Sequence, residues 1–274
     1  MKHVKVIGQV LATFILALYI GGSAIAQDHL NTPVVAPKTS PEQAQAEGRY
    51  VYNRPTPENS VLLLIDHQTG LISGIQDYTS LAEYKNNVLA LAKMAKAFDI
   101  PVVLTTSNAQ WQNGELLKEL KALFPDQKII RRYGIINAYE DPNFRAALEA
   151  TGRDHVLIAG VTLGTCTAFP TLSMLQDGYK VFPVIDAAGA WSRYEADAAI
   201  ARMTQAGAEP VAVFSLLAEM QYDWRRDTAN AAGTIFNEHL PEYGLVMDNF
   251  WNTVGQAVSD PFGLANDGAA QDDE

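Results

Sequence analysis

The sequence predicts an α/β protein with a three-layer αβα, doubly wound fold, in which helices cover both faces of a six-stranded parallel sheet. Between residues 60 and 248, short apolar runs typical of strands alternate with longer amphipathic segments typical of helices. The strand-like runs are apolar throughout, as expected when both faces of a strand are buried. The 274 residues, 48% of them hydrophobic, are enough for one sizeable core.

The first expected strand is the apolar run 61–65, which ends at Asp66. A helix over 81–98 follows, because its apolar residues fall along one side, and a short turn leads to the second strand, 100–104. The later segments repeat this alternation. They are the expected helices 116–124, 142–150 and 166–176 and the expected strands 129–130, 155–159, 181–185 and 211–214.

Three side chains of chemical interest follow the expected strands. Asp66 follows the first strand, Arg132 the third, and Cys166 the fourth across a tight turn at 160–165. Ligands in doubly wound folds bind beyond the carboxyl ends of the strands. These three residues are therefore the candidates for a functional site.

Residues 1–26 have the three-part layout of a secretory signal peptide. Two lysines precede an apolar run at 6–20, and small residues lead up to Ala26. We expect cleavage after Ala26 and export, to the periplasm. The alternative is an N-terminal membrane anchor, because the apolar run approaches the roughly 20 residues that span a bilayer.

The rest of the chain divides into a Pro-rich N-terminal arm at 27–58, which has no helical or strand period and is expected to be extended, the α/β domain at 59–251 and an acidic C-terminal tail at 252–274. The formal net charge is −11, and loss of the signal segment would remove two lysines and no acids, leaving −13. Such acidity disfavours nucleic acid and anionic lipid as partners. We expect a small-molecule substrate and no stable membrane association after signal cleavage.

Cys166 is the single cysteine and so cannot form a disulfide within the chain. A free cysteine is often an inert, buried residue. Cys166, however, should open a helix, where unpaired amides and the helix dipole stabilise a thiolate. This position predicts a lowered thiol pKa and a nucleophile. The same amides can stabilise the oxyanion that forms when a thiolate attacks a carbonyl.

Asp66 can act as the proton acceptor for this thiol if its surroundings raise its pKa. Its alternative role is to cap the segment that follows the strand. Arg131 and Arg132 are alternatively surface cations, and strand alternation directs only one of them toward the cleft.

Several motifs resemble those of isochorismatase-like cysteine hydrolases. They are Leu64-Ile65-Asp66-His67-Gln68, Arg132 with Gly134 and Ile136-Asn137-Ala138, and Ala159-Gly160-Val161 leading to Cys166-Thr167-Ala168-Phe169-Pro170. Segments 85–91, 104–107 and 205–208 are most similar to the YcaC-type branch, and the similarity runs from about residue 59 to 251.

The resemblance implies a catalytic triad of Asp66, Arg132 and Cys166, and an oxyanion hole formed by the backbone amides of Thr162 and Cys166. It also implies a cis peptide bond before Thr162 and a ring-like homo-oligomer. Arg132 stands where many relatives have lysine. Because arginine stays charged at neutral pH, its role would be to stabilise the thiolate and orient Asp66.

A second departure from the family is Leu163-Gly164, which stands where a Thr-Glu pair is frequent. Related nicotinamidases bind a metal through Asp and His residues, but here no histidine lies between His67 and His155. We therefore predict no metal and no cofactor, and a structural role for His67. Among the aromatic residues Phe169, Trp191, Tyr194 and Trp224, core packing is the default expectation and Trp191 is the best candidate for the substrate pocket.

The predicted function is hydrolysis of a carbon–nitrogen bond in a small amide through a thioester on Cys166. True isochorismatases act on a vinyl ether without this cysteine, and its presence therefore favours an amide. The altered turn at 163–164 suggests an alternative, a catalytically weak binding or scaffold protein of the same fold. Hydrolysis of a non-amide substrate in the same pocket is a third possibility. An inert thiol with an ordinary pKa would favour the scaffold.

Overall fold

The computed structural model describes residues 33–254, which belong to two compact units divided between Tyr52 and Asn53. The predicted signal peptide, and the tail beyond residue 254, lie outside the described residues. Among residues 33–254, no helix combines the length and the apolar character that crossing a bilayer requires.

Residues 33–52 of the first unit contain one short helix, α2 (Pro41–Ala46), within the arm that the sequence predicts to be extended. The Ser40 hydroxyl accepts a hydrogen bond from the Gln43 amide, and the Gln43 side chain accepts one from the Ser40 amide. This reciprocal capping box, with Pro41 in the first turn, starts the helix. The expectation of an arm without helix is therefore wrong at this point.

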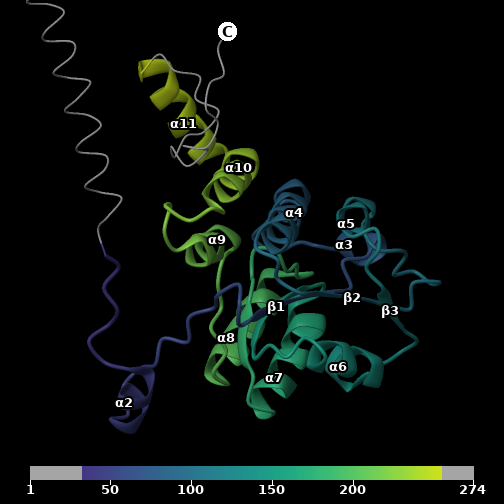
Figure 1. Ribbon diagram of the computed structural model, residues 1–274. Helices are drawn as coiled ribbons and strands as arrows, with labels where there is room; N and C mark the ends of the chain where they lie inside the picture. Colours follow the sequence, from purple (N-terminus) through teal and green to yellow (C-terminus); the bar gives the residue numbers. More distant parts are fainter. Residues whose placement is uncertain (1–32, 255–274) are drawn as a thin grey trace, which may run out of the picture. The chain divides into compact units, whose positions relative to one another are not determined.

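The second unit is built on a parallel sheet with the strand order β3-β2-β1-β4-β5 (Figure 1). Its central strand, β1, pairs on both sides, with Leu64 opposite Leu104 on one side and Ala159 on the other. The strands are β1 (Ser60–Ile65), β2 (Val102–Ser107), β3 (Ile129–Arg132), β4 (His155–Gly160) and β5 (Lys180–Pro183).

The sheet thus has five strands, and the expectation of a sixth strand at 211–214 is wrong. Only Val211 forms a bridge, to Val184. Pro210 lacks an amide that could extend the pairing. Immediately afterwards the Asp186 carboxylate accepts a hydrogen bond from the Val213 amide at 2.9 Å, which caps a helix in place of a strand.

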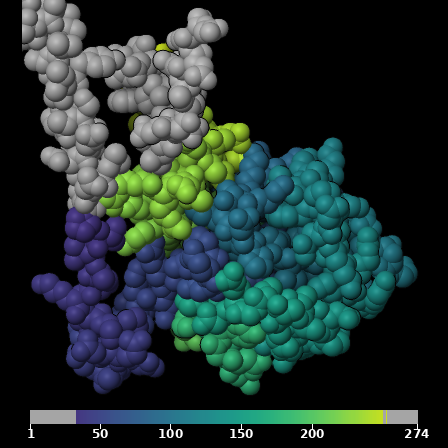
Figure 2. All heavy atoms as spheres, viewed as in Figure 1, coloured from purple at the N-terminus to yellow at the C-terminus, as the bar shows by residue number. Residues whose placement is uncertain are grey.

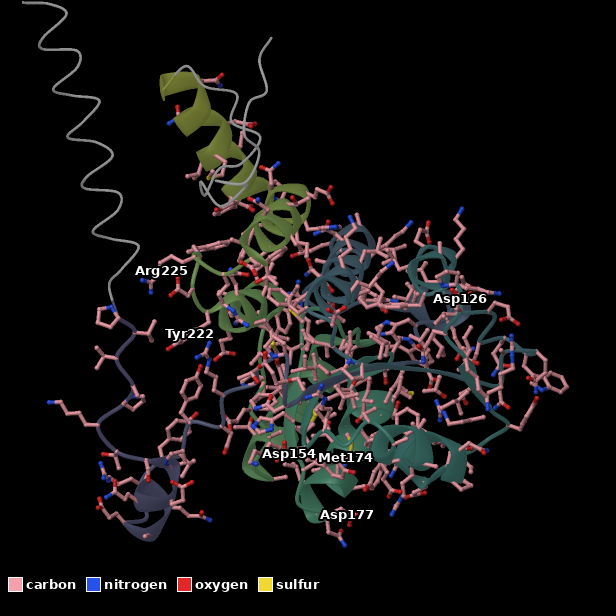
Figure 3. All side chains as sticks on the ribbon, viewed as in Figure 1. Asp126, Asp154, Met174, Asp177, Tyr222 and Arg225 are labelled. Atoms are coloured by element: carbon pink, nitrogen blue, oxygen red, sulfur yellow. The ribbon has the colours of Figure 1, made fainter. Side chains whose placement is uncertain are left out.

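Helices cover both faces of the sheet, as predicted (Figure 1). Leu62 and Leu64 of β1 pack into a core cluster with α4 and α9, whereas Leu63 packs with α6 and α7 on the other face. Met174 of α7 lies in this second layer and is fully buried (Figure 3). These helices are α4 (Leu81–Ala97), α6 (Pro142–Glu149), α7 (Ala168–Gln176) and α9 (Val213–Gln221).

The C-terminal part of the domain packs beside α4. The Asn86 side chain donates to the His239 carbonyl at 2.7 Å, and Lys93 pairs with Glu238 at 2.6 Å. Figure 2 shows the yellow-green surface of this segment next to the blue surface of α4. The remaining helices of the unit are α3 (Thr69–Ile72), α5 (Lys118–Leu123), α8 (Arg193–Gln205), α10 (Ala229–His239) and α11 (Pro241–Val254).

Candidate active site

Asp66 lies at the carboxyl end of the central strand, where the chain turns sharply. Its φ angle of 59° is in the left-handed region, which aspartate tolerates better than most residues. The Asp66 amide donates to the Thr105 carbonyl at 3.0 Å, and its side chain is fully buried. The carboxylate is thereby held beneath the ends of β1 and β2.

Arg132 ends β3 and points inward, with only 1% of its surface exposed. One terminal nitrogen, Nη2, donates to both carboxylate oxygens of Asp66. Its Nε donates to the Thr105 hydroxyl at 3.0 Å, and Nη1 donates to the carbonyls of Ile135 and Ile136. The guanidinium is therefore held from several sides.

Arg131 points the other way, as strand alternation predicts. Its guanidinium pairs with Glu115 at 3.0 Å, and both side chains are substantially exposed. Arg132 is therefore the arginine that reaches the site.

Cys166 reaches the same place from the turn after β4. This turn is a π-helical segment, Leu163–Thr167, that precedes α7, so the helix begins two residues later than predicted. The Cys166 thiol lies beside the Asp66 carboxylate, and its sulfur accepts a hydrogen bond from the Thr165 hydroxyl at 3.6 Å. The peptide bond between Val161 and Thr162 is cis, as the resemblance implies.

The pKa of the Cys166 thiol is raised to about 12, which contradicts the lowered pKa expected for a helix start. Burial is the main cause, and the negative charge of Asp66 adds to it. The hydroxyl of Thr165 and the positive charge of Arg132 oppose this rise. In the free protein, Cys166 is therefore a neutral thiol at physiological pH.

Burial also raises the pKa of Asp66, although the charge and hydrogen bonds of Arg132 act in the opposite direction. The net effect is a raised pKa for Asp66, and this favours proton transfer from a thiol, because a carboxylate with a higher pKa is a better proton acceptor. The thiol and the carboxylate both line the cavity, and each affects the pKa of the other.

Above the three side chains lies a cavity of about 410 Å³. Among the described residues, the backbone amide of Thr162 donates to no protein acceptor, so it is free to bind a ligand. Asp66 and Cys166 of the predicted site line the cavity, whereas Arg132 does not. The residues that line the cavity are Asp66, Leu71, Ser107, Asn108, Asn113, Gly134, Ile136, Val161, Thr162, Thr165, Cys166, Trp191 and Glu195.

Trp191 forms one wall of this cavity. Its indole nitrogen donates to the Leu71 carbonyl at 3.1 Å, and half of the side chain, 50%, is exposed. Tyr194 is 89% exposed. The default expectation of core packing is therefore wrong for both residues.

Glu195 is a cavity residue that the sequence analysis missed. One of its carboxylate oxygens accepts the Gly164 amide at 3.2 Å, and the other accepts the Trp191 amide at 2.8 Å. The available signal was Ser192, whose hydroxyl accepts the Glu195 amide at 3.2 Å and starts α8. A carboxylate from α8 thus reaches the turn at Gly164.

His67 lies behind the site and is fully buried. Its ring nitrogens contact the Tyr84 hydroxyl at 2.5 Å and the Ala159 carbonyl at 3.2 Å, and burial lowers its pKa to about 4. These contacts give it the structural role that the sequence predicts. Residues 33–254 contain no cluster of three or more His, Cys, Asp or Glu side chains suited to a metal ion.

Comparison with known proteins identifies the family. The Isochorismatase domain matches residues 60–213. Probable hydrolase YcaC of Escherichia coli (strain K12) is 42% identical over 199 residues, or 73% of this chain and 95% of that protein. The chain therefore belongs to the isochorismatase-like superfamily.

Two solved structures narrow this assignment. YcaC from Pseudomonas aeruginosa, with hexane-2,5-diol and covalent acrylamide, is 44% identical, has a TM-score of 0.71, and is matched over 98% of its length and 73% of this chain. E. coli YcaC, described as an octameric hydrolase of unknown specificity, is 42% identical with a TM-score of 0.71, over 98% of its length and 74% of this chain. Within the superfamily, the chain belongs to the YcaC-type branch.

Replacing Asp66 with asparagine should lower the pKa of Cys166, because it removes a negative charge and leaves the Arg132 cation facing the thiol. We expect iodoacetamide to alkylate the folded variant at pH 8 at least about tenfold faster than the wild type. Mass spectrometry of the single cysteine gives the rate, and circular dichroism checks the fold. Asp186→Asn, at a half-buried carboxylate outside the cavity whose pKa burial also raises, is the control. An unchanged rate in folded Asp66→Asn would contradict the assigned cause.

Proposed function

We propose that the protein hydrolyses the carbon–nitrogen bond of a small amide, with Cys166 as the nucleophile. The observation that carries the proposal is the position of the Asp66 carboxylate, which binds the Arg132 guanidinium and lines the same cavity as the Cys166 thiol, close enough to raise the pKa of that thiol. Nucleophile, base and orienting cation thus lie together at one site.

In the first step, the thiol proton moves to Asp66 as the sulfur attacks the amide carbonyl carbon. Negative charge leaves the carboxylate and passes through the sulfur to the carbonyl oxygen, while Arg132 remains as a fixed positive charge nearby. The free amide of Thr162, together with the amide of Cys166, would stabilise this oxyanion. The raised thiol pKa is compatible with this step, because the proton goes to an adjacent carboxylate and not to solvent.

In the second step, Asp66 returns the proton to the leaving nitrogen, the carbon–nitrogen bond breaks, and an amine departs. The acyl group stays on Cys166 as a thioester. Asp66 then takes a proton from water as the water oxygen attacks the thioester carbonyl. The carbon–sulfur bond then breaks, Asp66 returns this proton to the sulfur, and the carboxylic acid leaves. One amide and one water thus give one acid and one amine, with the thiol and the carboxylate restored.

Chemistry in a relative supports this assignment. The related Pseudomonas protein carries acrylamide covalently, and acrylamide is both a small amide and an electrophile that adds to thiolates. In this chain, Cys166 is the single cysteine and lines the cavity, so it is the thiol that such a reagent would reach.

A binding or scaffold protein remains the second candidate, and one observation favours it. The pKa of Cys166 is raised to about 12, so the resting thiol is far less reactive than a typical catalytic cysteine. The two functions differ in turnover, because a scaffold would bind small amides without consuming them.

Large apolar side chains near the cavity support a homo-oligomer, which we also propose. Ile136 and Trp191 line the cavity and are 59% and 50% exposed. Such surfaces are typical of protein interfaces. Other exposed aromatic residues nearby in the sequence are Trp111, Tyr133 and Tyr194, at 68%, 79% and 89%.

Replacing Cys166 with alanine should lower the rate of amide turnover by about 10³-fold or more while leaving the fold intact. A screen of small amides with ammonia detection measures turnover. Ser173→Ala, on α7 but outside the cavity, is the matched control and should keep wild-type rates. Undiminished turnover in Cys166→Ala would exclude the cysteine mechanism. Binding of small amides without turnover by the wild type would instead favour the scaffold.

We further propose export to the periplasm and assembly into a complex like that of the octameric relative. Native mass spectrometry of protein recovered from the periplasmic fraction tests both. The expected species has about eight chains, each beginning at Gln27. A monomer would contradict the assembly, and chains that retain residues 1–26 in the membrane fraction would contradict the cleavage.

A further inference from the structure

The charge inside the cavity is set by two carboxylates with different partners. Asp66 is paired with Arg132, and this ion pair is electrically neutral. Glu195 accepts hydrogen bonds from two backbone amides, which carry no net charge. Among the described residues, no lysine, arginine or histidine forms an ion pair with Glu195.

Arg193, the cationic residue nearest to Glu195 in the sequence, has other partners. The guanidinium of Arg193 lies 5.2 Å from the centre of the Tyr78 ring, and its Nε donates to the Asp77 carbonyl. The other polar residues that line the cavity are neutral serine, threonine and asparagine side chains. With the thiol protonated, the cavity therefore has one excess negative charge, on Glu195.

This carboxylate is held in one place. Its two oxygens accept hydrogen bonds from the amide of Gly164, in the turn that carries Cys166, and from the amide of Trp191, which also lines the cavity. A Cβ atom at Gly164 would lie only 2.8 Å from the Glu195 side chain, so the glycine allows the close approach. The negative charge is thus fixed between the nucleophile and an exposed indole ring.

We propose that Glu195 determines substrate specificity, selecting small amides that carry an ammonium group and rejecting those that carry a carboxylate. An ammonium group in the cavity would face the Glu195 carboxylate and the Trp191 ring, both of which attract cations. A carboxylate there would be repelled without a free cation to bind it. This inference rests on the proposed amide hydrolysis for its substrate class, and on the cavity alone for its charge preference.

Three amides of similar size test the charge preference directly: 4-aminobutanamide as the cation, pentanamide as the neutral reference and succinamate as the anion. In the wild type, kcat/KM should be about tenfold or more higher for the cation than for the anion. In Glu195→Gln this ratio should fall to about threefold or less, and Glu195→Asp should restore part of it. Asp197→Asn removes a charge from the same helix outside the cavity and should leave the ratio unchanged.

A second measurement does not depend on hydrolysis. Methanethiosulfonates with 2-aminoethyl and 2-sulfonatoethyl groups convert the Cys166 thiolate to a mixed disulfide and release methanesulfinate. In the wild type, the rate constant for the cationic reagent should be at least about tenfold higher than that for the anionic reagent. In Glu195→Gln, the two rate constants should become similar.

The two measurements separate the possible failures. If no amide is consumed but the thiosulfonate ratio depends on Glu195, the hydrolysis proposal falls and the charge selection stands. If amides are consumed and both ratios are the same in wild type and Glu195→Gln, Glu195 does not select substrates and this inference is overturned.

Discussion

The buried ion pair between Asp66 and Arg132 is the interaction on which the rest of the site depends. Both side chains are almost fully buried, so removing one partner would leave an unpaired charge in the interior, at a typical cost of about 3 to 5 kcal/mol. The guanidinium also binds Thr105 on β2 and carbonyls that follow β3. One arginine therefore joins three strand ends and sets the position of the carboxylate.

That pair also affects how the cysteine can work. Burial raises the pKa of Cys166, the negative charge of Asp66 beside Arg132 adds to this rise, and the thiol rests in its neutral form. A nucleophile of this kind is activated only when substrate allows the proton to move to the carboxylate, and the negative charge then remains close to the same arginine. The site thus limits unproductive reactions of the thiol with solvent electrophiles while keeping the base beside the thiol.

The sequence predicted Asp66, Arg132 and Cys166 because parallel strands bring their carboxyl ends to one edge, so residues far apart in the chain converge there. It could not predict the thiol pKa, which depends on burial and on the distance to a charge from another strand. A helix replaces the expected sixth strand because Asp186 binds the Val213 amide. The position of Glu195 in the cavity depends on which helix faces Gly164. Both are tertiary contacts between segments that sequence patterns treat separately.

Direct titration of Cys166 tests the central claim that the thiol is neutral at rest and loses its proton to Asp66 only as it reacts. Because the chain has a single cysteine, ¹³C labelling at Cβ gives one NMR signal for this residue. The signal should keep its thiol shift from pH 6 to at least about 10 in the free protein, in line with the raised pKa. A thiolate shift at pH 7 in the free protein would contradict the claim.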